Sequence, residues 1–305
     1  MHKVPTPAAA IDLGSNSFRL MIGLRSGQEL VVLAKARAPI SLAHGLGITG
    51  NLTPDKQEAA LTAIASFRRE MDSFNVGSVR CCGTEALRRA VNSRALLEPA
   101  VEILGSPIEI LSGHQEAELS SQGVRGTLAE QLSLPCLIAD VGGGSCELIF
   151  HASADGPPMI ISLPIGTVML AELDAKSRKL ALGSFSAQVK DFLQETGQST
   201  IKVMVATGGT AGCLAMLAQD LVVYDSAKIK GFSLSRTKIN DIHRWLARMP
   251  VEQRKVLPGL EAGREEIIIS GLEIYQEILA TIGATGMIVS DAGVLEGILF
   301  SITGA

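Results

Sequence analysis

The sequence predicts an α/β protein made of two related domains. Short apolar runs alternate with longer helical patterns along the whole chain, which is typical of this fold class. A twelve-residue segment at 11–22 recurs without gaps at 139–150, and Asp, Gly, Ser and Leu coincide in the two copies. With 305 residues, of which 47% are hydrophobic, the chain can fill two cores.

In the first half of the chain, each predicted strand is an apolar run bounded by polar residues, glycine or proline. The predicted strands cover residues 8–13, 18–24, 29–36, 78–82 and 108–111, and the predicted helices cover 54–74, 85–91 and 115–123. Thr53 and Pro54 open the first of these helices as an N-cap followed by a first-turn proline, which indicates where the helix starts.

The second half of the chain continues the alternation of strands and helices. The predicted strands cover residues 137–141, 146–150, 159–163, 203–206 and 287–289, and the predicted helices cover 184–195, 211–218, 236–247, 264–282 and 294–301. Within 264–282 the aliphatic residues recur at helical spacing, which favours a core position or a dimer face for Ile267, Ile268, Leu272, Ile274 and Leu279.

Each copy of the repeat has the form of a hairpin: a strand, an Asp, a tight turn with Gly and Ser, and a second strand. Such a turn exposes N–H groups and hydroxyls that can bind an anion. Either copy alone favours an ordinary hairpin, whereas the matched pair favours two anion-binding turns that serve one cleft. Asp140 and Glu147 beside the second turn would repel an anion, unless a divalent cation such as Mg²⁺ lies between them.

Other residues have the chemistry that a polyanionic ligand requires. Arg19 and Arg88 carry guanidinium groups, which bind phosphate bidentately, although either can equally form a surface salt bridge. Residues 207–211 lead from a strand into a helix through Gly208, Gly209 and Thr210, a setting for an anion or a nucleotide. These residues join the two turns as candidates for a phosphate-binding site.

Composition excludes several classes of partner. The formal charge of −4 argues against nucleic acid, because duplex binders usually carry a basic field. Five cysteines without C-x-x-C spacing indicate reduced thiols rather than disulfides or a zinc site. No apolar run approaches the roughly 20 residues of a membrane-spanning helix, and Asp12 interrupts the N-terminal apolar stretch where a secretory leader would lie. We therefore expect a cytoplasmic protein with no membrane partner.

Motifs along most of the chain resemble those of the exopolyphosphatase and guanosine pentaphosphate phosphohydrolase (Ppx/GppA) family, within the actin and sugar-kinase superfamily. They are IDLGSNSFRLMIG at 11–23, CCGTEALRRAVNS at 81–93, IEILSGHQEAEL at 108–119, ADVGGGSCEL at 139–148, SLPIGTVML at 162–170, ATGGTAGCLA at 206–215, LPGLEAGREEIIISG at 257–271 and SDAGVLEGIL at 290–299. The hairpin motifs point to the superfamily, and the segment Ser-Gly-x-x-Glu-Ala between them points to the family.

This resemblance implies two ribonuclease-H-like domains with a central active-site cleft. The first would span residues 1–122 and the second 123–290, with a C-terminal helix at about 291–305 packing back onto the first. The implied activity is Mg²⁺-dependent hydrolysis of a terminal phosphoanhydride in inorganic polyphosphate or guanosine pentaphosphate. The family also suggests a homodimer.

The resemblance assigns roles to individual residues. Glu116 matches the catalytic general base of the family. Without the resemblance, Glu116 would be interpreted as a first-turn carboxylate that interacts favourably with the helix dipole. The implied metal ligands are Asp12, Asp140 and Glu147. Asp140 and Glu147 are also implied to act in catalysis, because they match acids that the family associates with the attacking water. Asp140 can instead have a structural role as the cap of its turn. The implied substrate-binding residues are Gly14, Ser15, Asn16, Ser17, Arg19, Arg88, Gly142, Gly143, Gly144, Ser145, Gly208, Gly209 and Thr210.

The chain departs from the family pattern in ways that reduce positive charge. Gln115 replaces the first of two successive acids, Met169 and Leu295 stand where arginine is common, and the usual Arg-Ala-Asp is Arg-Glu-Glu at 264–266. These changes put processive degradation of long polyphosphate in doubt, because a long polyanion needs many cations. Two alternatives stay open: a non-catalytic sensor of guanosine phosphates or polyphosphate, and a phosphotransferase like acetate or sugar kinases.

Overall fold

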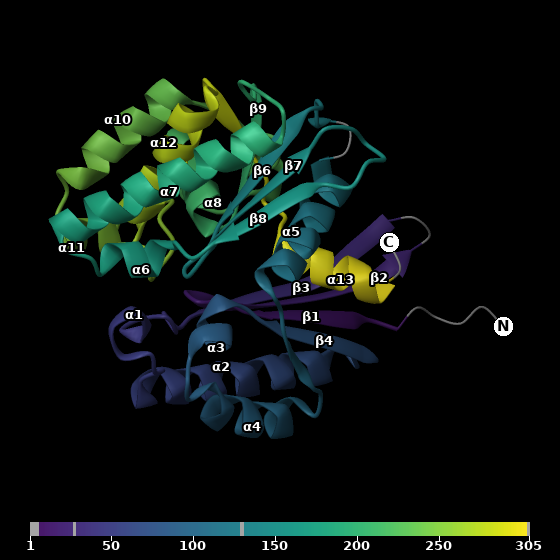
Figure 1. The fold of residues 1–305 in the computed structure, drawn as a ribbon. Coiled ribbons are helices and arrows are strands. Elements are labelled where there is room, and N and C mark those ends of the chain that lie inside the picture. The colour runs from purple at the N-terminus through teal and green to yellow at the C-terminus, as the bar shows by residue number, and fades with distance from the viewer. Residues whose placement is uncertain (1–5, 27–28, 129–130, 304–305) are drawn as a thin grey trace. The chain divides into compact units, whose positions relative to one another are not determined.

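The computed structural model describes residues 6–26, 29–128 and 131–303. The chain divides into two compact units. Unit 1 comprises Met1–Gly123 together with Val294–Ala305, and unit 2 comprises Val124–Gly293. Each unit is built around one sheet with helices packed on it (Figure 1), so the predicted α/β class with two domains is confirmed.

The sheet of unit 1 has five strands in the order β3-β2-β1-β4-β5. Strands β1 (Ala8–Leu13), β2 (Ser17–Ser26) and β3 (Glu29–Pro39) form an antiparallel meander, and β4 (Ser78–Gly83) and β5 (Ile108–Ile110) add to β1 in parallel. Strand β1 is buried over its whole length because its residues are apolar apart from Asp12.

Helices cover both faces of this sheet (Figure 1). Helix α2 (Pro54–Ser73) packs on β2 and on α4 (Ser93–Leu104), while α13 (Val294–Thr303) contacts β1, β2 and β4. Three further helices complete the unit: α1 (Leu46–Thr49), α3 (Glu85–Arg89) and α5 (Gly113–Leu128), the last of which runs on into unit 2. The C-terminal segment therefore belongs to the core of unit 1.

The sheet of unit 2 repeats this plan with one additional edge strand. Its order is β10-β11-β9-β6-β7-β8. Strands β6 (Cys136–Val141), β7 (Cys146–His151) and β8 (Met159–Leu163) form the antiparallel meander, and β9 (Val203–Thr207) and β11 (Gly286–Val289) follow in parallel. The short strand β10 (Ser233–Ser235) pairs antiparallel with β11. Both units thus share the strand order of the ribonuclease-H-like fold.

The helices of unit 2 enclose one apolar core. Helix α12 (Ile268–Ile282) lies against α7 (Ala175–Glu195), α10 (Arg236–Ala247) and α6 (Thr167–Ala171), and α8 (Gly209–Ala218) contacts β6 and β9. The short helices α9 (Ser226–Ile229) and α11 (Val251–Lys255) lie in the connections. Of the aliphatic stripe, Ile268, Leu272, Ile274 and Leu279 lie in this core and Ile267 is also buried, so the stripe is a core face.

Several element boundaries differ from those predicted. Helix α4 contains Pro99 in its interior and was not predicted, and α7 begins at Ala175 because the side chain of Asp174 caps it. Helix α12 begins four residues later than predicted. Thr53 precedes α2 as expected, with Pro54 at the first position, but its side chain makes no capping hydrogen bond.

Two further findings concern the cysteines and the helices. Each of the five cysteines is buried and free of a disulfide. Burial raises the pKa of the Cys82 thiol to about 12 and that of Cys136 to about 11. Among the helices that the structure describes, none is long and apolar enough to cross a membrane.

Candidate active site

The turn between β1 and β2 is tied to the rest of unit 1 through its carbonyl oxygens. Asn16 O accepts from the N–H groups of Ile40 and Ser41, at 3.0 and 2.7 Å, and Ser15 O accepts from Ala43 at 2.9 Å. The Ser15 hydroxyl accepts from the N–H of Ala86 at the start of α3. The oxygens of this turn are thus occupied, while the buried Nδ2 of Asn16 has no hydrogen-bond partner among the residues described.

The turn between β6 and β7 is likewise anchored through its carbonyl oxygens. Gly142 O and Gly143 O accept from the N–H groups of Thr167 and Val168, both at 2.9 Å, which anchors the turn to α6. Gly142 N–H closes the turn by donating to Ser145 O at 3.0 Å. In the described part of the chain, Gly143, Gly144 and Ser145 have no acceptor for their N–H groups. Such a row of N–H groups can bind an anion.

Glycine at the start of each turn is required by space. A Cβ on Gly14 would lie 2.9 Å from the carbonyl oxygen of Ser17, and a Cβ on Gly142 would lie 3.1 Å from that of Ser145. Any larger residue would push the two strands of the hairpin apart at the turn. The Gly that coincides in the two copies of the repeat therefore has a physical cause.

A row of cross-strand neighbours runs over three strands of unit 1 beside its turn. Asp12 on β1 stands opposite Arg19 on β2, which stands opposite Arg37 on β3. Arg19 donates from Nε and Nη2 to Asp12 Oδ2, at 3.0 and 2.6 Å. The other oxygen of Asp12, Oδ1, is buried and has no hydrogen-bond partner among the described residues. The row is basic, because it combines one acid with two arginines.

The equivalent row of unit 2 is acidic. Asp140 on β6 stands opposite Glu147 on β7, which stands opposite Ser162 on β8. Asp140 is 8% exposed and Glu147 is 1% exposed. Glu147 Oε1 accepts from Ser162 Oγ at 2.7 Å. Burial, and then the charges of Glu147 and Asp140, raise the pKa of the Cys146 thiol well above its usual value.

This acidic pair fits a magnesium ion. Two carboxylates that face each other on neighbouring strands are destabilising unless a cation compensates them. Mg²⁺ typically takes one or two protein carboxylates and completes its shell with water and substrate phosphate. Among the described residues, no group of three or more His, Cys, Asp or Glu side chains could hold a metal. In unit 2, the facing pair Asp140 and Glu147 offers two carboxylates, whereas Asp12 of unit 1 is bound to Arg19.

A second anion-binding feature of unit 2 lies where β9 enters α8. Gly208 has φ of 94°, a value that favours glycine, and a Cβ there would lie 3.2 Å from Asp140 Oδ1. A Cβ on Gly209 would overlap the guanidinium of Arg264. Thr210 Oγ1 is buried without a hydrogen-bond partner among the described residues. Helix α8 thus begins between the carboxylate of Asp140 and a guanidinium.

Arg264 is a candidate site residue that the sequence analysis did not select. It is 8% exposed, and its Nε donates to Glu261 Oε2 at 2.7 Å. In the part of the chain that the structure describes, its Nη groups have no hydrogen-bond acceptor. The sequence offered one signal, because Arg264 retains the first residue of the family's Arg-Ala-Asp segment. A buried guanidinium against the Gly208–Thr210 turn is suited to a phosphate.

Glu116 lies in the first turn of α5 and is 8% exposed. Its Oε2 lies 3.5 Å from Nη1 of Arg88. Arg88 also donates to the carbonyl oxygen of Leu111 and to Oε2 of Glu85. Two residues that the sequence predicted for different roles, general base and substrate binder, are thus in contact within unit 1.

The structure explains two of the departures from the family pattern. Ser112 and Gln115 form a capping box, in which Ser112 N–H donates to Gln115 Oε1 at 2.8 Å and Gln115 N–H donates to Ser112 Oγ at 3.2 Å. Gln115 therefore fixes the start of the helix that carries Glu116. Leu295 is 5% exposed and lies in the apolar core of unit 1, with Ala8, Ala10 and Met21.

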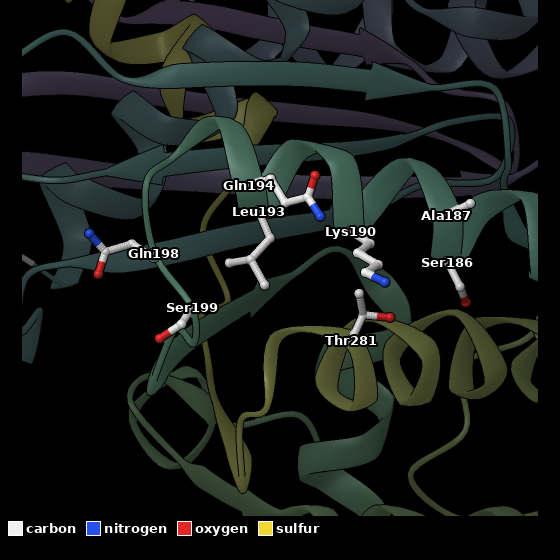
Figure 2. Close-up of a pocket in the computed structure, with 8 residues that line it drawn as sticks. All are labelled: Ser186, Ala187, Lys190, Leu193, Gln194, Gln198, Ser199 and Thr281. Carbon is white, nitrogen blue, oxygen red and sulfur yellow. The ribbon is translucent and has the colours of Figure 1, made fainter.

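A shallow cavity of about 530 Å³ lies elsewhere on unit 2 (Figure 2). It is formed by α7, the segment after it, and Thr281 of α12, and Lys190 and Leu193 are among the residues that line it. None of the predicted site residues lines it.

The chain was compared with known proteins. The model of the Ppx/GppA phosphatase family matches residues 22–305. Exopolyphosphatase 2 of Mycobacterium tuberculosis is 28% identical over 323 aligned positions, which cover 98% of this chain and 99% of that protein. Both matches extend over nearly the whole chain.

Solved structures agree with these matches. The Aquifex aeolicus PPX-GPPA enzyme is 29% identical, with a TM-score of 0.77 over 98% of this chain and all of that one. An exopolyphosphatase from Cytophaga hutchinsonii is 20% identical, with a TM-score of 0.86 over 98% of each chain, a likeness that concerns the fold.

Proposed function

The chain belongs to the Ppx/GppA phosphatase family, whose members hydrolyse phosphoanhydride bonds, and we propose that it is a magnesium-dependent exopolyphosphatase that releases terminal phosphate from inorganic polyphosphate. The observation that carries this proposal is the buried pair Asp140 and Glu147 beside a turn with three N–H groups that have no acceptor in the described chain. Acids next to an anion-binding turn suit a substrate whose phosphates carry a cation, because the cation can lie between the carboxylates and the phosphates.

Several groups of unit 2 would bind the phosphates. The N–H groups of Gly143 to Ser145 offer one set of donors, and Thr210 Oγ1 with the Nη groups of Arg264 offers another. Both sets flank Asp140, since Gly208 lies against its carboxylate. Hydrogen bonds to charged groups are strong in buried positions, so these donors would hold and orient the terminal phosphates.

Asp140 and Glu147 would hold the magnesium ion through carboxylate oxygens, and Ser162 keeps Glu147 oriented. When bound, the ion supplies positive charge to the phosphate oxygens and orients them for displacement. In unit 1, Arg19 and the turn at Gly14 to Ser17 are proposed to bind further phosphates of the substrate. Arg19 already neutralises Asp12, so we assign Asp12 a lesser part in metal binding than the sequence predicts.

Glu116 is proposed as the general base. Hydrolysis of a phosphoanhydride requires that a water lose its proton as it attacks the terminal phosphorus. Glu116 is a buried carboxylate on the first turn of a helix, where the capping box of Ser112 and Gln115 fixes the backbone. It would accept the proton of the attacking water at a carboxylate oxygen.

Guanosine pentaphosphate is the second candidate substrate. Its phosphates are few, and this protein has Met169 and the buried Leu295 where arginine is common in the family. Fewer cations favour a short polyanion over a long one. The cytoplasmic location and the homodimer stay predictions of the sequence, and light scattering after size exclusion would test the dimer.

One assay tests the proposal: phosphate release from short polyphosphate, long polyphosphate and guanosine pentaphosphate, with and without Mg²⁺. We expect the wild type to release phosphate only with Mg²⁺, and Glu116→Gln to lose about 100- to 10,000-fold in kcat. Glu118→Gln is the matched control, because Glu118 lies on the same helix and is exposed. Binding without turnover by the wild type would establish the sensor alternative, and near-normal rates of Glu116→Gln would refute its role as base. Transfer of phosphate to a small acceptor would favour the phosphotransferase.

A further inference from the structure

An arginine stands between two buried acids in unit 1. Arg88 on α3 donates from Nη2 to Oε2 of Glu85, and its Nη1 lies 3.5 Å from Oε2 of Glu116. Glu85 is 7% exposed and Glu116 is 8% exposed. The guanidinium of Arg88 thus contacts both carboxylates, and its closer contact is with Glu85.

Backbone anchors fix this arrangement. Arg88 Nη1 also donates to the carbonyl oxygen of Leu111, which lies between β5 and α5. Glu85 occupies the first turn of α3, where a carboxylate is favoured by the helix dipole, and its Oε1 lies 3.8 Å from Nε of Arg89. The guanidinium is therefore held by α3 on one side and by the start of α5 on the other, and it has little freedom to leave Glu116.

Sharing one cation has a chemical consequence for a general base. A carboxylate that is fully paired with an arginine is a poor proton acceptor, because the guanidinium stabilises its charged form. A buried carboxylate without any cation would lose its orientation and its charge. If the guanidinium makes its closer contact with a second acid, it still holds the base in place, but it neutralises the base only in part.

We propose that Arg88 and Glu85 are positioning residues for Glu116: Arg88 holds the Glu116 carboxylate in place, and Glu85 limits how far Arg88 neutralises it. This inference rests on the proposed role of Glu116 as base. It assigns Arg88 to the base rather than to the substrate, and it gives Glu85 a part in catalysis that requires no contact with the substrate.

Steady-state kinetics of Glu85→Gln test the proposal. Without Glu85, Arg88 pairs fully with Glu116, so we expect kcat to fall about 10- to 100-fold while KM changes less than about threefold. Glu85→Asp, which keeps the charge, should recover a large part of kcat. Glu98→Gln is the matched control, because Glu98 pairs with Arg94 on the exposed face of α4 in the same unit. An unchanged kcat, or a rise in KM alone, would overturn the proposal.

A second measurement does not depend on activity. Thermal unfolding of Glu85→Gln, Glu116→Gln and the double variant forms a double-mutant cycle. If Glu85 and Glu116 share Arg88, the guanidinium still contacts one carboxylate in either single variant. In the double variant it contacts neither. We expect the melting temperature of the double variant to lie about 2 °C or more below the additive value. Additive effects would refute the sharing.

The two measurements separate the proposals. Full activity of Glu116→Gln would remove the base from the proposed function, while the unfolding cycle would still decide whether Glu85 and Glu116 share Arg88. Loss of activity in Glu116→Gln together with full activity in Glu85→Gln would leave the proposed function intact and reject this inference.

Discussion

The hairpins β1–β2 and β6–β7 have the same strand order, the same turn and the same spacing between Asp and its cross-strand neighbour. They differ in what that neighbour is. In unit 1 Asp12 faces Arg19, and the next strand adds Arg37. In unit 2 Asp140 faces Glu147, and the next strand adds Ser162.

One repeated scaffold therefore presents opposite charge at equivalent positions. The row of unit 1 is internally compensated by the ion pair between Arg19 and Asp12. The row of unit 2 places two buried acids opposite each other, so its charge is negative. We propose that unit 1 binds phosphate directly and that unit 2 binds phosphate together with a metal ion. Four predictions test whether the two rows differ in this way.

The largest expected effect is on activity. Glu147→Gln should lower Mg²⁺-dependent phosphate release about 100- to 1,000-fold, because the metal loses half of its carboxylate pair. The measurement is kcat as a function of Mg²⁺ concentration, with Glu265→Gln as a control, since that carboxylate accepts a local N–H from Gly263. If Glu147→Gln keeps both the wild-type rate and the wild-type Mg²⁺ dependence, the acidic row is not the metal site.

The second prediction concerns the free energy of unfolding at acidic pH and the buried His151 of unit 2. His151 stands at the repeat position that Gly23 occupies in unit 1, and burial, with a contribution from Arg125, lowers the pKa of His151 to about 4. A folded-state pKa below the unfolded value means that only the unfolded chain binds the proton between about pH 6.5 and pH 4. The free energy of unfolding should therefore fall by about 3 kcal/mol as the pH drops through this window.

Denaturant unfolding at several pH values, with intrinsic fluorescence or circular dichroism as the signal, checks this prediction. His151→Gln cannot take up a proton, so the slope of stability against pH between 4 and 6.5 should flatten in that variant. An equal slope in the two proteins would mean that other groups cause the acid sensitivity.

A smaller effect concerns the ion pair of unit 1. Arg19→Gln leaves the buried Asp12 without its cation, so the free energy of unfolding should fall by about 2 kcal/mol. At the same repeat position of unit 2, Glu147→Gln removes one of two facing acids and should leave stability equal or higher. Unfolding in urea without Mg²⁺ compares the two variants directly. If both substitutions changed the free energy of unfolding in the same direction, the stability of the two rows would not depend on their charge.

The smallest effect is stabilisation by the metal itself. Mg²⁺ at ten times its dissociation constant should raise the free energy of unfolding of the wild type by about 1.4 kcal/mol, because it binds only the folded chain. Glu147→Gln should lose this gain, and Arg19→Gln should keep it. Melting curves with Mg²⁺ and with Ca²⁺ would show the effect, and a gain retained in Glu147→Gln but lost in Arg19→Gln would reverse the assignment of the two units.

The sequence was most informative where the determinants are local. Both hairpins were found from one repeat, because the Gly, the Asp and the alternation that define a tight hairpin lie within twelve residues. Helix α4 escaped detection because Pro99 interrupts its pattern, yet its apolar face packs against α2 and outweighs that penalty. Gln115 looked like a loss of charge, and its function as the partner of Ser112 in the capping box became visible from the hydrogen bonds.

The candidate site divides in the same way. Asp140 and Glu147 could be paired from sequence, because a hairpin with a known turn sets which residues face each other. Arg264 could not be placed, since it lies far along the chain from the Gly208–Thr210 turn that it contacts. Arg88 was selected for its charge, and the structure added that this charge is directed at Glu85 and Glu116.

The class of fold, the two hairpins and the acids beside their turns follow from the order of neighbouring residues, so they could be predicted from the sequence. The charges that stand beside those acids depend on tertiary packing. Arg37 and Ser162 reach their rows through the register of a third strand, and Arg88 reaches Glu116 from another helix. Strand register and helix packing depend on the whole core, so the charge of each row could not be predicted from the local sequence.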